Sequence, residues 1–308
     1  MIENFLTVGT QVIILFLLIG VGAICAKTHL FGEQTVHGMA NIALFFATPC
    51  VIIRSFQRPL SADLLRGLGI SALAAIGTHL LGILLARLFV RDPDDTRRRV
   101  LQFGVVFSNA GYMAIPLQLA LLGEEGVFYG SIYVAVFNLM LWTYGAATMG
   151  DGWRSLSARK LLLNPGVIGV VVGLLLLFSG ITLPELLAAP VGHLANLNTP
   201  LPMLIIGYYL AQADLKAAVR DRASYLTILL RVAVVPLIML GVLWLCGVRG
   251  AVLVSAVVGA SAPVATGTTM FATRYNRAPE LSVNLVVLST IVSIITMPLI
   301  VGLARVIG

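Results

Sequence analysis

The chain consists almost entirely of long apolar runs joined by short polar connections. A helix needs about 20 mostly apolar residues to cross the hydrocarbon core of a bilayer, and ten runs approach or exceed this length. They cover residues 5–26, 36–56, 65–90, 100–122, 125–149, 163–181, 187–211, 222–246, 250–272 and 279–305. The longest polar stretch is 91–99, too short to hold a soluble domain. The pattern therefore predicts an all-α polytopic membrane protein with ten transmembrane helices, and any function must lie within the membrane.

The composition excludes a water-soluble globular protein. Of the 308 residues, 59% are hydrophobic and only 11% are charged, whereas soluble domains carry about 25% charged residues. Three cysteines, Cys25, Cys50 and Cys246, lie in or beside apolar runs and form no C-x-x-C pair. They are therefore interpreted as small packed residues, and neither a disulfide, a metal site nor a cofactor is expected.

The positive residues predict an orientation in the membrane. Lys and Arg accumulate in cytoplasmic connections. With the N-terminus outside, 14 of the 20 fall inside, five fall outside and Arg231 lies in a run. The inside set is Lys27, Arg87, Arg91, Arg97, Arg98, Arg99, Arg154, Arg159, Lys160, Lys216, Arg220, Arg222, Arg274 and Arg277. We therefore expect a multi-pass protein of the inner (plasma) membrane with both termini extracytoplasmic. The net charge of +7 is explained by topology, so nucleic acid is not an expected partner.

Landmarks recur between the two halves of the chain. The Pro49 and Pro202 segments, Pro116 and Pro263, and Asn138 and Asn284 are separated by 153, 147 and 146 residues. Residues 1–149 and 150–308 would each contain five spans, and an odd number inverts the second half relative to the first. Inverted repeats are a common architecture of secondary transporters.

Two runs are interrupted where a continuous helix is disfavoured. The run 100–122 carries Ser-Asn-Ala-Gly at 108–111, and the run 250–272 carries Gly259, Pro263 and Gly267. Backbone groups left unpaired in lipid are tolerated only beside protein or a water-filled cavity, and half-helix N-termini favour an anion such as a carboxylate. The breaks predict a substrate site, although two proline kinks that only shape the bundle would leave the same pattern. The candidate residues are Asn109, Ala110, Gly111, Tyr112, Pro116, Ser261, Pro263, Val264 and Thr266.

Three further candidates, Arg231, Asn138 and Asn284, lie in other runs, and each of them, like Tyr112, has a structural alternative. Arg231, about nine residues into its run, could attract an anion, or could snorkel or pair with carbonyls at helix C-termini. Asn138 and Asn284 could brace the crossing of the broken helices or the substrate site, or could join helices. Tyr112 could contact a ligand or simply pack.

Several stretches resemble the auxin efflux carrier family, which includes plant PIN-type exporters and bacterial malonate and malate permeases. The N-x6-P spacing after Asn109 and the FA-x-x-YN-x-x-P-E pattern at 271–280 are specific in combination. The resembling segments are NIALFFATPCVIIRSF (41–56), SNAGYMAIPLQLALLGEEG (108–126), NPGVIG (164–169), RVAVVPLIML (231–240), VRGAVL (248–253) and FATRYNRAPELSVNLVVLSTIVSIITMPL (271–299).

The resemblance implies two inverted five-helix repeats divided into two bodies. Spans 1, 2, 6 and 7 would form a scaffold, often dimeric, and spans 3–5 and 8–10 a body that moves organic anions by an elevator-like shift. Spans 4 and 9 would cross at their breaks. Asn109 would contact substrate, and Pro116 and Pro263 would be the crossing prolines. Plant members have Gln where this chain has Val264, which argues against auxin itself.

The positions of the acidic residues bear on the coupling mechanism. None of the 13 Asp and Glu residues falls in mid-span, and His79 is the one intramembrane candidate for proton coupling, with a hydrogen-bonded structural role as its alternative. We therefore expect a potential-driven exporter of small organic anions such as auxin-like acids, malonate or malate. A sodium- or proton-coupled symporter of the bile-acid type is the alternative.

Rival classes lack their signatures. No H-E-x-x-H motif, mid-span acid pair or serine elbow indicates an intramembrane enzyme. No ring of charges marks a channel, and no long loop offers a receptor output domain. The protein is therefore not expected to be an enzyme.

Overall fold

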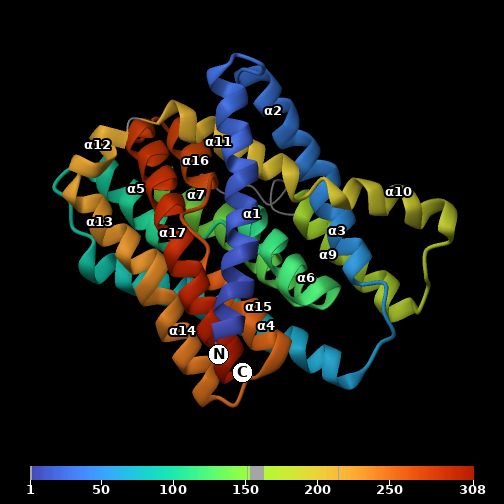
Figure 1. Ribbon diagram of the computed structural model, residues 1–308. Helices are drawn as coiled ribbons and strands as arrows, with labels where there is room; N and C mark the ends of the chain where they lie inside the picture. Colours follow the sequence, from blue (N-terminus) through green and yellow to red (C-terminus); the bar gives the residue numbers. More distant parts are fainter. Residues whose placement is uncertain (1, 151, 153–162, 214) are drawn as a thin grey trace.

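The computed structural model describes residues 2–150, 152, 163–213 and 215–308. Arg154, Arg159 and Lys160, assigned to an inner connection, lie outside these residues. The described chain is built from helices (Figure 1). They are α1 Ile2–Lys27, α2 Glu33–Ile42, α3 Thr48–Ser55, α4 Ala62–Phe89, α5 Asp95–Val106, α6 Ile115–Met140, α7 Ala146–Met149, α9 Pro165–Ser179, α10 Glu185–Asn196, α11 Pro200–Gln212, α12 Leu215–Arg220, α13 Arg222–Leu229, α14 Val235–Leu245, α15 Gly250–Ser261, α16 Gly267–Arg274 and α17 Pro279–Ile307.

The all-helical, multi-pass character expected from the sequence is confirmed. Six helical stretches within the described ranges are long and apolar enough to cross a membrane. These are Phe5–Lys27, Glu33–Ser55, Ala62–Phe89, Ala110–Met149, Arg222–Leu245 and Pro279–Ile307. Two shorter apolar helices, Pro165–Ser179 and Gly250–Ser261, accompany them.

Proline shapes several of these helices by widening a turn instead of ending the helix. Four π-helical turns lie in the described chain: Ala43–Ala47, Ala110–Ala114, Leu141–Gly145 and Leu230–Val234. Three of them are followed, two residues on, by Pro49, Pro116 and Pro236. A proline ring clashes with the carbonyl one turn earlier, and a π turn is a common way to relieve such a clash. Pro116 therefore lies in the first turn of α6, within a helix that continues through it.

Two predicted runs differ in detail from the helices found. The run 187–211 is divided into α10 and α11 by a turn at Leu197–Thr199, because Pro200 and Pro202 are suited to a helix start but not to its interior. The predicted boundary between runs at 122–125 coincides with a kink at Gly123, whose φ of 63° favours glycine.

Two sets of helices can be distinguished by their packing, and they meet where α1 packs on α17 and where α3 and α9 pack on α6. In one, α1 packs on α11, and α3 packs on α9 and α10. In the other, α4, α5, α6 and α15 surround a core of aromatic rings that includes Phe103, Phe107 and Phe271. Figure 1 shows α2, α3 and α10 on one side of α1, with α5, α12 and α13 on the other. The start of α1 and the end of α17 lie together at one end of the molecule, where Phe5 packs on Gly302 (Figure 1).

Candidate functional site

The two interrupted helices meet at their interruptions. The helix is absent at 107–109, after α5, and at 262–266, between α15 and α16. These segments run antiparallel, with Ser108 opposite Val264. The N–H of Asn109 donates to the carbonyl of Pro263 at 2.7 Å, and the N–H of Ala265 donates to the carbonyl of Phe107 at 2.9 Å. Each break therefore provides hydrogen-bond partners for backbone groups that the other break leaves unpaired.

Local sequence explains the second break. Pro263 has no N–H to donate, and the residue before it, Ala262, takes an extended conformation with ψ of 145°, as a residue preceding proline tends to. The N–H of the fully buried Val264 donates to the hydroxyl oxygen of Ser289 on α17 at 3.1 Å. The break is thus held by a neighbouring helix as well as by its partner segment.

A buried arginine joins the two half-helices beside this pairing. Arg231, in the π turn before α14, has no exposed surface. Its Nη1 donates to the carbonyls of Val105 at 3.0 Å and Val106 at 3.3 Å, and its Nη2 donates to the carbonyl of Ala260. These carbonyls belong to the last turns of α5 and α15, where helices lack internal partners and carry negative partial charge. Of the interpretations left open for Arg231, the observed contacts are those with helix C-terminal carbonyls.

Asn109 presents an unused amide at the first break. The backbone carbonyl of Asn109 accepts from the N–H groups of Met113 and Ala114, and the residue as a whole is only 3% exposed. The side-chain Nδ2 is buried without a hydrogen-bond partner in the described part of the chain. Gly111 and Tyr112 beside it are half-buried, and a Cβ at Gly111 would meet no described atom within 4 Å. A donor and open space therefore lie together at the crossing.

Further polar groups surround the crossing on the α4 side. The Nδ1–H of His79 donates to the carbonyl of Ala75 at 2.7 Å, so part of its bonding is local to its own helix. Its ring lies 5.8 Å from that of Phe107 and 6.0 Å from that of Tyr133, centroid to centroid. The His79 Nε2 is buried and unpartnered within the described residues. No group of three His, Cys, Asp or Glu residues suited to a metal ion occurs in the same part of the chain.

The sequence matches a family of known membrane proteins. A family model described as "membrane transport protein" matches residues 7–158 and 153–301. The chain belongs to this family. The expected membership of the auxin efflux carrier family is thereby confirmed. An "uncharacterized transporter" of Methanothermobacter thermautotrophicus is 25% identical over 94% of this chain and 95% of its own. Another, of Methanocaldococcus jannaschii, is 22% identical over 68% of this chain and 70% of its own.

The transporter brings most, but not all, of its predicted site residues together. Asn109 lies at one break, with Ala110, Gly111 and Tyr112 in the π turn directly after it, and Pro263, Val264 and Thr266 lie at the other, with Ser261 ending α15. Asn138 lies elsewhere: it accepts from the amide of Asn164 at 3.3 Å, and Asn164 caps the start of α9. Asn284 is half-buried on α17, and Pro116 follows the break by a π turn.

Some residues that hold the two breaks together were not predicted from the sequence. Ser108 and Phe107 form the pairing, and Ser289 bonds Val264 from a distant helix. For Ser108, the one indication in the sequence is its place beside Asn109 in the middle of an apolar run.

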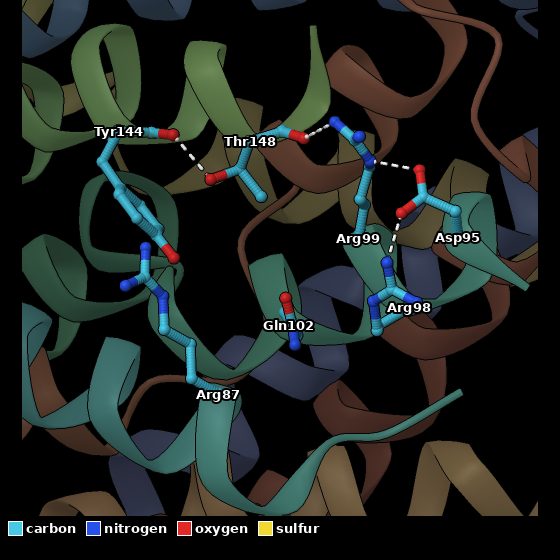
Figure 2. Close-up of a pocket in the computed structure, with 7 residues that line it drawn as sticks. All are labelled: Arg87, Asp95, Arg98, Arg99, Gln102, Tyr144 and Thr148. Atoms are coloured by element: carbon cyan, nitrogen blue, oxygen red, sulfur yellow. Dashed lines mark hydrogen bonds and ion pairs between the residues drawn. The ribbon is translucent and has the colours of Figure 1, made fainter. Parts of the chain in front are cut away.

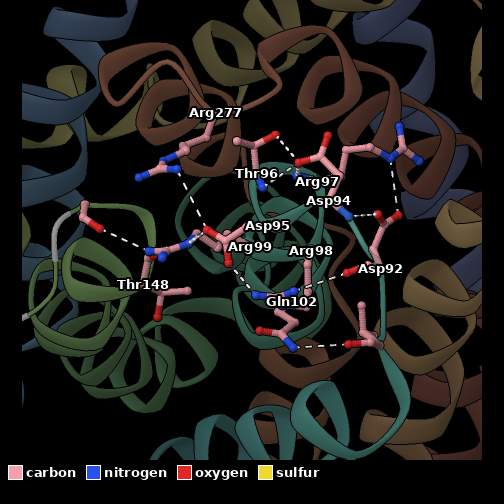
Figure 3. Close-up of polar contacts among 12 residues, drawn as sticks. Asp92, Asp94, Asp95, Thr96, Arg97, Arg98, Arg99, Gln102, Thr148 and Arg277 are labelled. Carbon is pink, nitrogen blue, oxygen red and sulfur yellow. Dashed lines mark hydrogen bonds and ion pairs between the residues drawn. The ribbon is translucent and has the colours of Figure 1, made fainter.

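A charged cluster ties three connections of the transporter together at one end. Asp95 binds Arg99, with Nε–Oδ2 at 2.6 Å, and also Arg98 and Arg277 (Figure 3). The hydrogen bond from Arg99, followed by the charges of Arg98 and Arg277, holds the pKa of the Asp95 carboxyl below its usual range. Arg97 bonds Asp92 at 3.2 Å and Asp221 at 2.9 Å.

A polar pocket of about 200 Å³ opens beside this cluster (Figure 2). Three arginines, Arg87, Arg98 and Arg99, line it together with Asp95, so the charges of its wall sum to about +2. The guanidinium of Arg87 lies 5.8 Å from the ring centre of Tyr144. The pocket is therefore an electropositive hollow at the end where the predicted inner connections gather.

Proposed function

We propose that this transporter carries small organic anions, carboxylates such as auxin-like acids, malonate or malate, across the inner (plasma) membrane. The observation that carries the proposal is the unpartnered Asn109 amide beside open space at the paired breaks. An amide N–H₂ donates to carboxylate oxygens without adding a fixed charge. A site built from amides, hydroxyls and backbone suits an anion better than a cation, because no carboxylate is among the predicted site residues.

The fold favours an inverted-repeat carrier. Ten spans would form two inverted halves, 1–149 and 150–308, in which spans 4 and 9 run antiparallel where they cross. The antiparallel pairing of Ser108 with Val264 agrees with this arrangement. In our proposal α1, α2–α3, α9 and α10–α11 form a dimeric scaffold, and the remaining helices form the body that moves. The contacts of α1 with α11 and of α3 with α9 and α10 support this division, and the packing of α1 on α17 and of α3 and α9 on α6 would form the boundary between the two bodies.

The charge distribution favours the proposed orientation. Arg97 pairs with Asp221, and Arg277 lies near Asp95, so three connections assigned to the inside share one end. Arg54, assigned to the outside, pairs with Glu124 at 2.9 Å. With both termini extracytoplasmic, the pocket of Figure 2 faces the cytoplasm and would concentrate anions there.

A ligand screen tests the proposal directly. Purified protein is heated with a panel of mono- and dicarboxylates, because a ligand that binds only the folded state raises the melting temperature. Hits are then assayed for saturable uptake and counter-exchange in proteoliposomes. Asn109→Ala should lose at least about tenfold in affinity for each hit, equivalent to about 1.4 kcal/mol.

The matched control is Asn196→Ala, which removes an exposed asparagine amide at the end of α10, where its oxygen accepts from Arg54 and not from a residue of either break. It should keep the wild-type affinity. A panel without hits, or hits whose binding is equal in both variants, would reject the proposed site. Conductance without saturation or counter-exchange would indicate a channel.

A further inference from the structure

The contacts of Arg231 resemble those of a bound metal cation. One guanidinium lies against carbonyls of Val105, Val106 and Ala260, drawn from two different half-helices. All three belong to last helical turns, where carbonyls have no partner in their own helix. Two negative helix ends therefore converge on a single positive charge.

The charge is also isolated from carboxylates. Arg231 is fully buried, and within the described residues no carboxylate lies within ion-pair distance of it. Its neutralisation therefore comes from backbone dipoles. In transporters with broken helices, such C-terminal ends and unwound carbonyls commonly coordinate a coupling sodium ion or proton. Here the carbonyls are already engaged by a side chain.

We propose that Arg231 is a resident cation that holds the place of a coupling cation between the two half-helices. The protein then needs no sodium ion to hold α5 and α15 together, and its transport cycle does not couple to one. Removing the side chain would leave a cavity lined by three carbonyls, which is suited to a small cation. The binding part of this proposal is independent of the substrate, and only its flux part rests on the proposed carrier function.

The first measurement uses the unmodified protein. Its melting temperature is recorded while NaCl replaces choline chloride at constant ionic strength. We expect no saturable increase, since the site is filled. A saturable sodium-dependent increase would overturn the proposal whether or not any substrate is known.

The second measurement uses Arg231→Ala, purified with and without methylguanidinium. Losing a buried charge that bonds two helices should lower the melting temperature by roughly 5–10 °C. Methylguanidinium, or sodium, should restore at least half of this loss in a saturable manner. Arg231→Lys keeps a positive charge and should remain insensitive to both cations.

Arg249→Ala is the matched control. Arg249 also donates to a helix C-terminal carbonyl, that of Trp244 at 2.7 Å, but from the molecular surface. Its loss should create no cation response. If Arg231→Ala responds to cations no more than Arg249→Ala does, or folds equally well without any cation, the proposal is wrong. If Arg231→Ala is recovered only in methylguanidinium, the requirement itself supports it.

Once a transported anion has been found, its uptake can be measured as the third test. Uptake by the wild type should be equal in sodium and choline media. Sodium-dependent flux would reject the resident-cation proposal while leaving the carrier function intact.

Discussion

The backbone N–H of Asn109 lies 2.7 Å from the carbonyl oxygen of Pro263, across 154 residues of sequence. This hydrogen bond joins the two helix interruptions and places the side-chain amide of Asn109 at their junction. The residue that we propose to bind substrate is therefore fixed in position by the opposite half of the chain. A displacement of either break moves the proposed site.

Ser289 should be important for keeping the second break in place. Its hydroxyl accepts from the N–H of Val264 at 3.1 Å in a fully buried setting. Ser289→Ala leaves that N–H without a partner, and an unsatisfied buried donor costs about 1–3 kcal/mol. We expect a lower melting temperature and weaker ligand binding.

Ser293→Ala provides the comparison, because Ser293 lies one turn later on α17 and is equally buried. Its hydroxyl donates to the carbonyl of Thr290, inside its own helix, at 2.6 Å. The Ser293 variant should lose less than half as much stability. Equal losses in the two variants would show that Val264 does not depend on Ser289.

Gly207 should tolerate no side chain. A Cβ there would lie 2.1 Å from the carbonyl oxygen of Ile19 and 2.7 Å from the backbone nitrogen of Ala23, so α1 and α11 would have to separate. Overpacking of this kind costs about 1–3 kcal/mol or more. Gly207→Ala should therefore lower the melting temperature, whereas Gly9→Ala on α1, with no atom within 4 Å of the new methyl group, should not. Equal stability of the two variants would contradict the close approach.

The sequence predicts which segments are helical better than it predicts which helices are neighbours. Hydropathy gave the helical segments, and the Ser-Asn-Ala-Gly stretch and Pro263 gave both breaks, because these residues disfavour a helix locally. Arg231 could be recognised as a buried charge, but its carbonyl partners lie 29 residues away or further. A hydrophobic pattern does not specify which helices face one another. Asn138 and Ser289 illustrate the same limit, since their roles depend on contacts with distant segments.

The Asp95 cluster should make stability depend on pH in the acid range. The folded-state pKa of Asp95 lies below its ordinary value of 3.8, chiefly through the hydrogen bond from Arg99. Its contribution is therefore fully present above that value and is lost as the pH falls through the folded-state pKa. Wild type should exceed Asp95→Asn in melting temperature at about pH 6, and the difference should shrink toward about pH 3. A difference that stays constant with pH would contradict this role. Added salt should also reduce the difference, because the cluster is solvent-exposed.

The membrane potential should drive transport if no cation is coupled. One negative charge leaving the cell across 100 mV gains about 2.3 kcal/mol, which supports roughly a 50-fold gradient. Proteoliposomes loaded with a stabilising anion should therefore release it faster when valinomycin and a potassium gradient make the interior negative. Release should slow when the potential is clamped at zero, and a dianion should respond more steeply than a monoanion. Release that ignores the potential and requires a pH or sodium gradient would instead favour a coupled symporter, with His79 as the first residue to test for proton coupling.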